Sequence, residues 1–373
     1  MYKLKKALYG LKQAPRAWYN KIEAYFLQND FERCFCEHTL FTKSAKEGKI
    51  LIVSLYVDDL IYTGNDQGMC DEFKESMMLV FYMTNLEKMR YFLGIEVLQN
   101  TNGIFVCQQK YAQEVLIRFN MVECNPVKNP IVPGMKLSRT DTRPKADATL
   151  YKQAVGSLMY LTATRPDLMY VVSLISRFME NPSESHWNAV KRILRYIKGT
   201  IELGMLYKRG EDITLVAYTD SDYAGDVDDR KSTSGFVFSL GTGAVSWSSK
   251  KQPIVTLSTT EPEYIVAASC ACQCIWIMRI LETIGFKGQK HILILCDSNS
   301  AIKLSENSIF HGRSKHIDGR FHFLKDLVKE GKIKLSHYNT QNQIADIMTK
   351  SLKLEQFMKI RRMSGMIAAS DIN

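Results

Sequence analysis

The stretch that decides the fold runs from residue 213 to residue 249 and holds three short apolar segments, ITLVAYTD (213–220), GFVFSLG (235–241) and AVSWSS (244–249). β-Branched and aromatic residues dominate these segments, and turns with glycine and serine separate them, which predicts three short strands. The chain then continues with a long apolar helix, EYIVAASCACQCIWIMRILETIG (263–285), and a strand, HILILCD (291–297). A helix within residues 298–332, a further strand, IKLSHY (333–338), and a closing helical segment, NQIADIMTKSL (342–352), follow. This order predicts a mixed β-sheet flanked by helices, in the α/β (α+β) class.

Four acidic residues fall at the ends of these predicted elements. Asp220 ends the first strand and Asp297 ends the fourth, while Glu263 lies in the first turn of the long helix and Asp346 begins the closing helical segment. Strand ends and helix starts can meet at one edge of an open sheet, where binding crevices form. The sequence therefore predicts that these four carboxylates converge.

Each of these acids also has an ordinary structural explanation. Glu263 follows Thr260 at the spacing of a capping box, and the neighbouring Glu261 is an alternative to it as a ligand. Asp297 precedes Ser298 and Asn299, so it could cap a helix. The turn after Asp220 holds further acids that we expect to be mostly solvated, namely Asp222, Asp226, Asp228 and Asp229.

Four carboxylates around one point stay ionised only if cations lie among them, and carboxylate oxygens favour Mg²⁺ or Mn²⁺. Two such ions about 4 Å apart can activate a water molecule and stabilise the leaving oxygen of a phosphoryl group. The predicted reaction class is metal-dependent hydrolysis of a phosphodiester, with two ions at the site.

A second acidic pair lies in SLYVDDLIY (54–62). Its apolar flanks have the composition of strands, which predicts a hairpin with Asp58 and Asp59 at its tight turn. Two charges about 4 Å apart repel by about 4 kcal/mol at an effective dielectric near 20, a cost that a bound divalent cation would cancel. The alternative is an exposed acidic turn with both charges hydrated.

Between these regions, residues 149–210 alternate apolar and basic positions at helical spacing, and Pro166 and Pro182 divide them into about three helices. Four basic residues lie close together on the last helix, and they suit a nucleic-acid backbone or a solvated helix face: Lys191, Arg192, Arg195 and Lys198. The preceding residues 124–148 contain four prolines, which favours a surface linker.

The composition of the chain indicates which kinds of partner it could bind. The chain of 373 residues holds 49 Lys and Arg against 39 Asp and Glu, a net charge of +10, which suits a polyanion such as DNA or RNA. No apolar run approaches the roughly 18 residues of a membrane span, so we expect no membrane partner and an intracellular location. The nine cysteines lack the paired spacing of a zinc site, and we expect them to be reduced.

The motifs taken together resemble the Pol polyprotein of copia-type LTR retrotransposons, from the later part of the reverse transcriptase through the ribonuclease H domain. The strings that carry this resemblance cover nearly the whole chain: LKKALYGLKQAPRAWY, YVDDLIYTG, YFLGIEV, VGSLMYLTATRPDL, HWNAVKRILRYIKGT, DDRKSTSGFVFSLG, SWSSKKQP and QIADIMTKSL. One departure is Pro262, where the family usually has Ala, and proline is tolerated in the first turn of a helix.

The resemblance implies roles for particular residues. Asp58 and Asp59 would bind the two metals of the polymerase palm, with Gln13 and Arg16 near the nucleotide and primer. The ribonuclease H quartet would be Asp220, Glu263, Asp297 and Asp346, acting on RNA:DNA hybrids. The family polymerase has a further catalytic Asp on an earlier strand, and we expect this chain to begin after it, so that its polymerase is incomplete.

The resemblance also implies an organisation and a setting. We expect a partial palm and thumb (1–123), a linker (124–148), a helical connection (149–210), a ribonuclease H-like domain (213–352) and a tail (353–373). Cytoplasmic virus-like particles or the nucleus would be its location, with association with other Pol or Gag chains. The alternative to an active ribonuclease H is a catalytically silent remnant that only binds nucleic acid.

Overall fold

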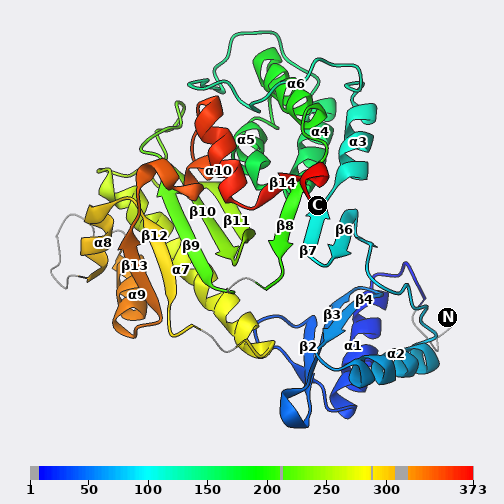
Figure 1. Ribbon diagram of the computed structural model, residues 1–373. Coiled ribbons are helices and arrows are strands. Elements are labelled where there is room, and N and C mark those ends of the chain that lie inside the picture. The colour runs from blue at the N-terminus through cyan, green and yellow to red at the C-terminus, as the bar shows by residue number, and fades with distance from the viewer. Residues whose placement is uncertain (1–7, 211–212, 287–288, 307–317, 373) are drawn as a thin grey trace, which may run out of the picture. The chain divides into compact units, whose positions relative to one another are not determined.

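The computed structural model describes residues 8–210, 213–286, 289–306 and 318–372. The chain divides into two compact units (Figure 1), unit 1 with Met1–Met89 and Gln273–Gly288, and unit 2 with Arg90–Cys272 and Gln289–Asn373. Contacts between residues define these units, whereas the predicted domain boundaries came from the sequence, and the two sets of limits differ. The units do not test the predicted boundaries, which stay a prediction.

Unit 1 is a four-stranded antiparallel sheet in the order β1-β2-β3-β4, with helices α1 and α2. Its elements are α1 (Ala14–Gln28), β1 (Glu32–Arg33), β2 (Leu40–Ser44), η1 (Lys46–Gly48), β3 (Ile50–Tyr56), β4 (Asp59–Gly64) and α2 (Gln67–Phe81). Aromatic side chains from the helices and the sheet form its core, in which Phe26 packs against Phe41 with ring centroids 4.8 Å apart and Phe73 lies beside them. Together these contacts bury one face of β3, and Leu60 and Tyr62 of β4 are partly buried against the same core.

Unit 2 contains two five-stranded sheets, in the orders β14-β8-β7-β6-β5 and β11-β10-β9-β12-β13. Its first elements are β5 (Tyr91–Phe92), β6 (Ile95–Asn100), β7 (Gly103–Cys107), α3 (Gln109–Arg118), α4 (Ala148–Leu161), α5 (Pro166–Ser176), α6 (Glu184–Lys198) and β8 (Leu203–Lys208). The later ones are β9 (Leu215–Ser221), β10 (Thr233–Leu240), β11 (Gly243–Lys251), β12 (Ile292–Cys296), α8 (Asn299–Glu306), α9 (Asp318–Lys329), β13 (Ile333–His337), η3 (Thr340–Asn342), η4 (Ile344–Met348), α10 (Leu354–Met363), β14 (Met366–Ala368) and η5 (Ala369–Asp371).

The helix α7 (Thr260–Thr283) begins in unit 2 and ends in unit 1. By length and composition it could cross a membrane, which contradicts our expectation that no segment has this character. Half of its most apolar stretch is buried inside the protein, and the core helix of a soluble protein passes the same test. Packing therefore accounts for the buried half of this stretch.

The sheet β11-β10-β9-β12-β13 is mixed, as predicted. The hairpin strands β9, β10 and β11 pair antiparallel, and β12 runs parallel to both β9 and β13. The register places Cys296 opposite Thr219, so that Asp297 follows beside Asp220 at the same edge. The predicted strands and the three predicted helices in the connection are all confirmed.

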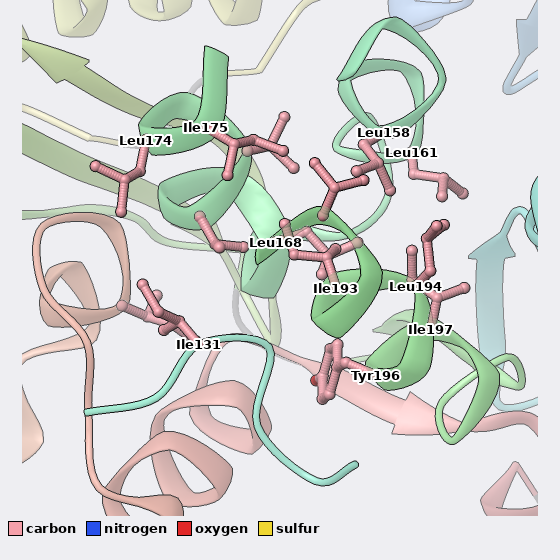
Figure 2. Close-up of a cluster of buried hydrophobic side chains, with 14 of the residues drawn as sticks. Ile131, Leu158, Leu161, Leu168, Leu174, Ile175, Ile193, Leu194, Tyr196 and Ile197 are labelled. Carbon is pink, nitrogen blue, oxygen red and sulfur yellow. The ribbon is translucent and has the colours of Figure 1, made fainter. Parts of the chain in front are cut away.

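One hydrophobic core joins the helices α4, α5 and α6 to this sheet. Figure 2 shows the side chains that these helices contribute to it. Leu168, Ile175 and Ile193 are fully buried at its centre. The segment predicted as a surface linker is irregular, but it also packs, since Ile131 and Leu137 belong to the same core. Proline content predicts the absence of regular structure and says nothing about burial.

A buried ion pair lies in the same region. Arg165 donates from Nε and Nη2 to the two carboxylate oxygens of Asp167, at 2.9 and 2.8 Å. Tyr196 donates to Asp167 at 2.6 Å, and Arg361 on α10 donates to the Tyr196 hydroxyl at 2.8 Å. This chain of contacts fixes α10 against α5 and α6.

Candidate active site

Asp220 is the first of the four predicted acids and lies near the end of the central strand β9, 2% exposed. Its partner across the ladder in β10 is Gly235. A Cβ atom at this glycine would lie 2.5 Å from Cβ of Met348, so the missing side chain lets the short helix η4 approach the sheet. In this way a glycine next to Asp220 brings the segment that carries Asp346 onto the same edge.

Glu263 and Asp297 lie beside Asp220. Glu263 accepts a hydrogen bond from the backbone N–H of Ser221, the residue after Asp220, at 3.0 Å. One ligand atom each from Glu263, Cys296 and Asp297 lies within 4.8 Å of the others. Thr340 donates to Asp297 at 3.1 Å and holds it at the strand end.

Asp346 completes the group through η4, which is a 3-10 helix where a helical segment was predicted. Its Oδ1 lies 2.9 Å from Nζ of Lys350, and the same ammonium group lies 3.4 Å from Oδ2 of Asp220. Thr349 also donates from its hydroxyl to Asp220. The structure therefore brings all four predicted acids together, which we name the carboxylate cluster: Asp220, Glu263, Asp297 and Asp346.

The crowding of charge changes the pKa values of these acids. Burial and the nearby charges of Asp220 and Asp297 raise the pKa of Glu263 to about 9. Burial and Asp220 likewise raise the pKa of Asp346 to about 7, and burial and Asp220 raise that of Asp297. Burial by itself would lower the pKa of Lys350, but the charges of Asp220 and Asp346 raise it above its usual value.

These shifts bear on the ligand that the carboxylate cluster suits. Its donors are carboxylate oxygens, the ligands of Mg²⁺ and Mn²⁺. Burial raises the pKa of the neighbouring Cys296 thiol to about 12, so a thiolate is not available there for a soft metal. A divalent cation would offset the repulsion that raises the carboxylate pKa values, and the residues therefore fit the predicted metals.

Glu261, the alternative to Glu263, has a different role. It accepts from the backbone N–H of Leu257 at 2.7 Å and so holds the chain that enters α7. Glu263 is the residue of this pair beside Asp297.

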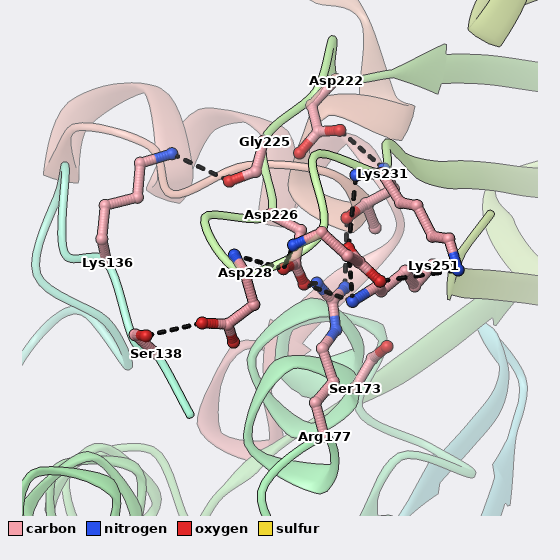
Figure 3. Close-up of polar contacts among 12 residues, drawn as sticks. Lys136, Ser138, Ser173, Arg177, Asp222, Gly225, Asp226, Asp228, Lys231 and Lys251 are labelled. Carbon is pink, nitrogen blue, oxygen red and sulfur yellow. Dashed lines mark hydrogen bonds and ion pairs between the residues drawn. The ribbon is translucent and has the colours of Figure 1, made fainter. Parts of the chain in front are cut away.

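The prediction that most acids after Asp220 are solvated is wrong (Figure 3). Asp226 is buried, with one carboxylate oxygen 2.7 Å from Nζ of Lys251 and 3.1 Å from Nη1 of Arg177. Asp222 is half-buried and accepts from the backbone of Thr233. These two acids hold the loop against β10, β11 and Arg177, the residue after α5. Asp228, in contrast, is exposed and accepts hydrogen bonds from Ser138 and Arg139 of the irregular segment 124–148.

The second predicted site lies in unit 1. The predicted hairpin is formed, with Val57 and Asp58 as its turn and Asp59 as the first residue of β4. Both acids are exposed at the hairpin end, which is the feature of the alternative, an exposed acidic turn. Val57 has φ of 54°, an unusual conformation for a β-branched residue, and its carbonyl accepts from the indole N–H of Trp18 on α1 at 2.5 Å. The exposed Gln13 and Arg16 lie at the start of the same helix.

The basic residues of α6 are partly accessible. Lys191 is exposed, while Arg192, Arg195 and Lys198 are half-buried. Arg195 donates to the backbone carbonyl of Asn125, and among the described residues no ion pair to a carboxylate is seen for any of the four. Nε of Arg192 is buried without a hydrogen-bond partner among these residues.

Sequence reasoning missed Thr349, Lys350 and Gly235. Lys350 follows Asp346 at the i, i+4 spacing at which side chains of one helical turn meet, and this signal could have identified it. Gly235 carried no such signal, because its importance depends on which segment approaches it from across the sheet.

Comparison with known proteins identifies a matching family and several relatives of the chain. Residues 1–133 match the family of reverse transcriptases (RNA-dependent DNA polymerases). The chain is 39% identical over 98% of its length to the retrovirus-related Pol polyprotein from transposon TNT 1-94 of Nicotiana tabacum, of which it covers 28%, and 41% identical over 95% of its length to that from transposon RE1 of Arabidopsis thaliana, of which it covers 24%. It is 32% identical over 72% of its length to a putative transposon Ty5-1 protein of Saccharomyces cerevisiae, and it covers 88% of that protein.

Among solved structures, the ribonuclease H domain of Mycobacterium tuberculosis rv2228c covers 40% of the chain, and the chain covers 97% of that domain, with 11% identity and a TM-score of 0.29. The fold assignment rests on the strand order and register of the mixed sheet.

The strand order of the mixed sheet defines a ribonuclease H-like fold, and residues 1–133 match the reverse transcriptase family. The chain belongs to the Pol polyprotein family of copia-type LTR retrotransposons. It spans about a quarter of the length of the TNT 1-94 and RE1 polyproteins.

Proposed function

We propose that this chain hydrolyses the RNA strand of RNA:DNA hybrids with Mg²⁺ or Mn²⁺, two ions per site. The observation that carries the proposal is the carboxylate cluster, in which Asp220, Asp297 and Asp346 meet Glu263 at one edge of the mixed sheet. Bound divalent ions would supply activation of water and stabilisation of the charge that develops on the phosphoryl group.

The chain's own residues would bind the ions and the nucleic acid and orient the carboxylates. Asp220 lies near the end of β9, and Asp297 directly follows the parallel strand β12. The N–H of Ser221 orients Glu263, and the hydroxyl of Thr340 orients Asp297. The 2′-hydroxyl is the group by which such a site distinguishes RNA from DNA. The four basic residues of α6 are proposed to contact phosphates of the duplex, with affinity that falls as salt rises.

For unit 1 we propose metal ligands of an RNA-directed DNA polymerase site. Asp58 and Asp59 would hold its metals at the hairpin end, and Gln13 and Arg16 would lie near nucleotide and primer. The link between α1 and the turn, through Trp18 and Val57, supports this arrangement.

The test is cleavage of an RNA:DNA hybrid by the full chain and by Asp297→Asn, which keeps the shape of the side chain and removes its charge. We expect the variant to lose most cleavage, about 100-fold or more if it removes a ligand from the metal site, while its affinity for the hybrid is kept. Asp326→Asn is the matched control, because Asp326 is exposed on α9.

The second candidate is a silent chain that binds nucleic acid without cutting it. The basic residues of α6 favour it, because no ion pair between them and a carboxylate is seen within the described ranges. A folded wild-type chain that binds the hybrid and leaves it intact with either metal would establish this alternative. An Asp297→Asn variant that cuts as fast as the wild type would instead show that cleavage does not depend on the carboxylate cluster.

A further inference from the structure

Lys350 lies inside the carboxylate cluster. Its Nζ is 2.9 Å from Asp346 and 3.4 Å from Asp220. The side chains of the two acids are only 6% and 3% exposed, whereas that of Lys350 is 40% exposed. The ammonium group thus reaches two buried carboxylates from the solvent side.

The backbone holds Lys350 in this place. Its N–H donates to the carbonyl of Asp346 at 3.2 Å, so the two residues share one turn. The preceding residue, Thr349, is fully buried and donates from its side chain to Asp220. Lys350 is therefore carried by the segment that closes the cluster and cannot move far from it, although its four-carbon side chain can rotate toward solvent.

Within the described ranges, Lys350 is the one cation that forms an ion pair with any member of the carboxylate cluster. The oxygens it contacts, Oδ2 of Asp220 and Oδ1 of Asp346, are also ones that a metal would use. A divalent ion would need oxygens at about 2.1 Å for Mg²⁺, and the ammonium and the ion repel each other, so both cannot occupy this position.

We propose that Lys350 is the resident counter-ion of the carboxylate cluster, and that a divalent ion binds Asp220 and Asp346 by displacing its ammonium group. Lys350 would then be a positioning residue that holds the two carboxylates together before metal binds, and it would set the metal concentration at which the site fills. This inference rests on the metal site of the proposed function.

The test measures binding of Mn²⁺ alone to the full 373-residue chain by isothermal titration calorimetry, together with the melting temperature of the metal-free protein. We expect Lys350→Met to bind Mn²⁺ about tenfold more tightly, because one repelling charge is removed, and to melt at a lower temperature without metal. Lys350→Arg keeps the charge and is expected to stay close to wild type.

Lys353→Met is the matched control, since Lys353 is exposed three residues further on and has no ion pair in the described part of the chain. It should change neither measurement. If Lys350→Met is unfolded without metal, Lys350→Gln is the second variant, and recovery of the fold on adding Mn²⁺ supports the proposal.

A folded Lys350→Met chain with unchanged or weaker Mn²⁺ affinity overturns the proposal, as does failure of both variants to fold at saturating Mn²⁺. Asp297→Asn distinguishes a failure of the proposed metal site from a failure of the proposed role of Lys350. If wild type and Asp297→Asn bind Mn²⁺ equally, or neither binds it, the carboxylate cluster does not hold the ion and both proposals fail. If Asp297→Asn loses binding and Lys350→Met equals wild type, only the role of Lys350 fails.

Discussion

At the scale of single residues, Asp226 shows how charge stabilises the loop between β9 and β10 (Figure 3). Burial opposes its ionisation, but the hydrogen bond from Lys251 and the N–H groups of Asp228 and Asp229 outweigh burial and lower the pKa of Asp226 from 3.8 to about 2. A carboxyl whose pKa is lower in the folded state contributes stability above its unfolded pKa and loses it as the pH falls through the folded value.

We therefore predict that Asp226→Asn lowers the free energy of unfolding at pH 7 by about 2 kcal/mol, from the size of the pKa shift. The difference from wild type should shrink between pH 4 and pH 2, where wild-type Asp226 becomes protonated. Thermal melting followed by circular dichroism at pH 7, 5 and 3 would measure it, with Asp326→Asn as control. A difference that stays constant over this range would contradict the role of the charge.

At the scale of elements, the position of η4 depends on the absence of a side chain at Gly235. Cβ of an alanine there would meet Cβ of Met348 at 2.5 Å and Cγ2 of Thr349 at 2.7 Å. Because Met348 and Thr349 are fully buried, neither can easily move aside. The segment that carries Asp346 would have to shift away from the sheet.

Gly235→Ala is accordingly expected to destabilise the protein by roughly 1–3 kcal/mol, the usual cost of overpacking, and to weaken Mn²⁺ binding by separating Asp346 from Asp220. Gly156→Ala is the matched control, since a Cβ on this α4 glycine meets nothing within 4 Å and should stabilise the helix slightly. Urea unfolding and Mn²⁺ titration of both variants test this. Equal behaviour of the two alanine variants would show that η4 does not depend on close approach.

The same elements show how far sequence can predict this protein. The strands that carry Asp220 and Asp297 follow from apolar, β-branched segments with turn residues between them, and the four acids could be selected because each stands at an element's end. Burial of Asp226, and the inclusion of Ile131 and Leu137 in the core, could not be predicted, because they depend on contacts between segments far apart in the sequence. Lys350 lies between these cases, since its spacing from Asp346 was visible but its contact with Asp220 was not.

At the scale of the whole molecule, unit 2 has a core that joins the ribonuclease H-like sheet to the connection helices. Val237 on β10 and Ile347 on η4 belong to the same cluster as Leu168 and Ile175 on α5. A boundary at residue 213 would cut through this core. Each large apolar side chain that loses its cover costs about 1.5–3 kcal/mol, so a few of them approach the total stability of a domain.

We therefore predict that residues 213–352, expressed alone, fold less stably than the full chain, with a broader and lower thermal transition and increased binding of a hydrophobic dye. The full chain under the same conditions is the comparison. A sharp transition of the fragment at the temperature of the full chain would show that the sheet does not need the helices.

The most direct test of the central claim, that the carboxylate cluster is a metal-dependent site for RNA in hybrids, is strand-specific cleavage by the full chain. The RNA strand is labelled and presented in an RNA:DNA hybrid, and the same sequence is presented as a DNA duplex, with Mn²⁺ or with chelator. We predict metal-dependent cleavage of the RNA strand in the hybrid and none of the DNA duplex. An intact RNA strand with folded protein and saturating metal, or equal cleavage of both duplexes, would contradict the account.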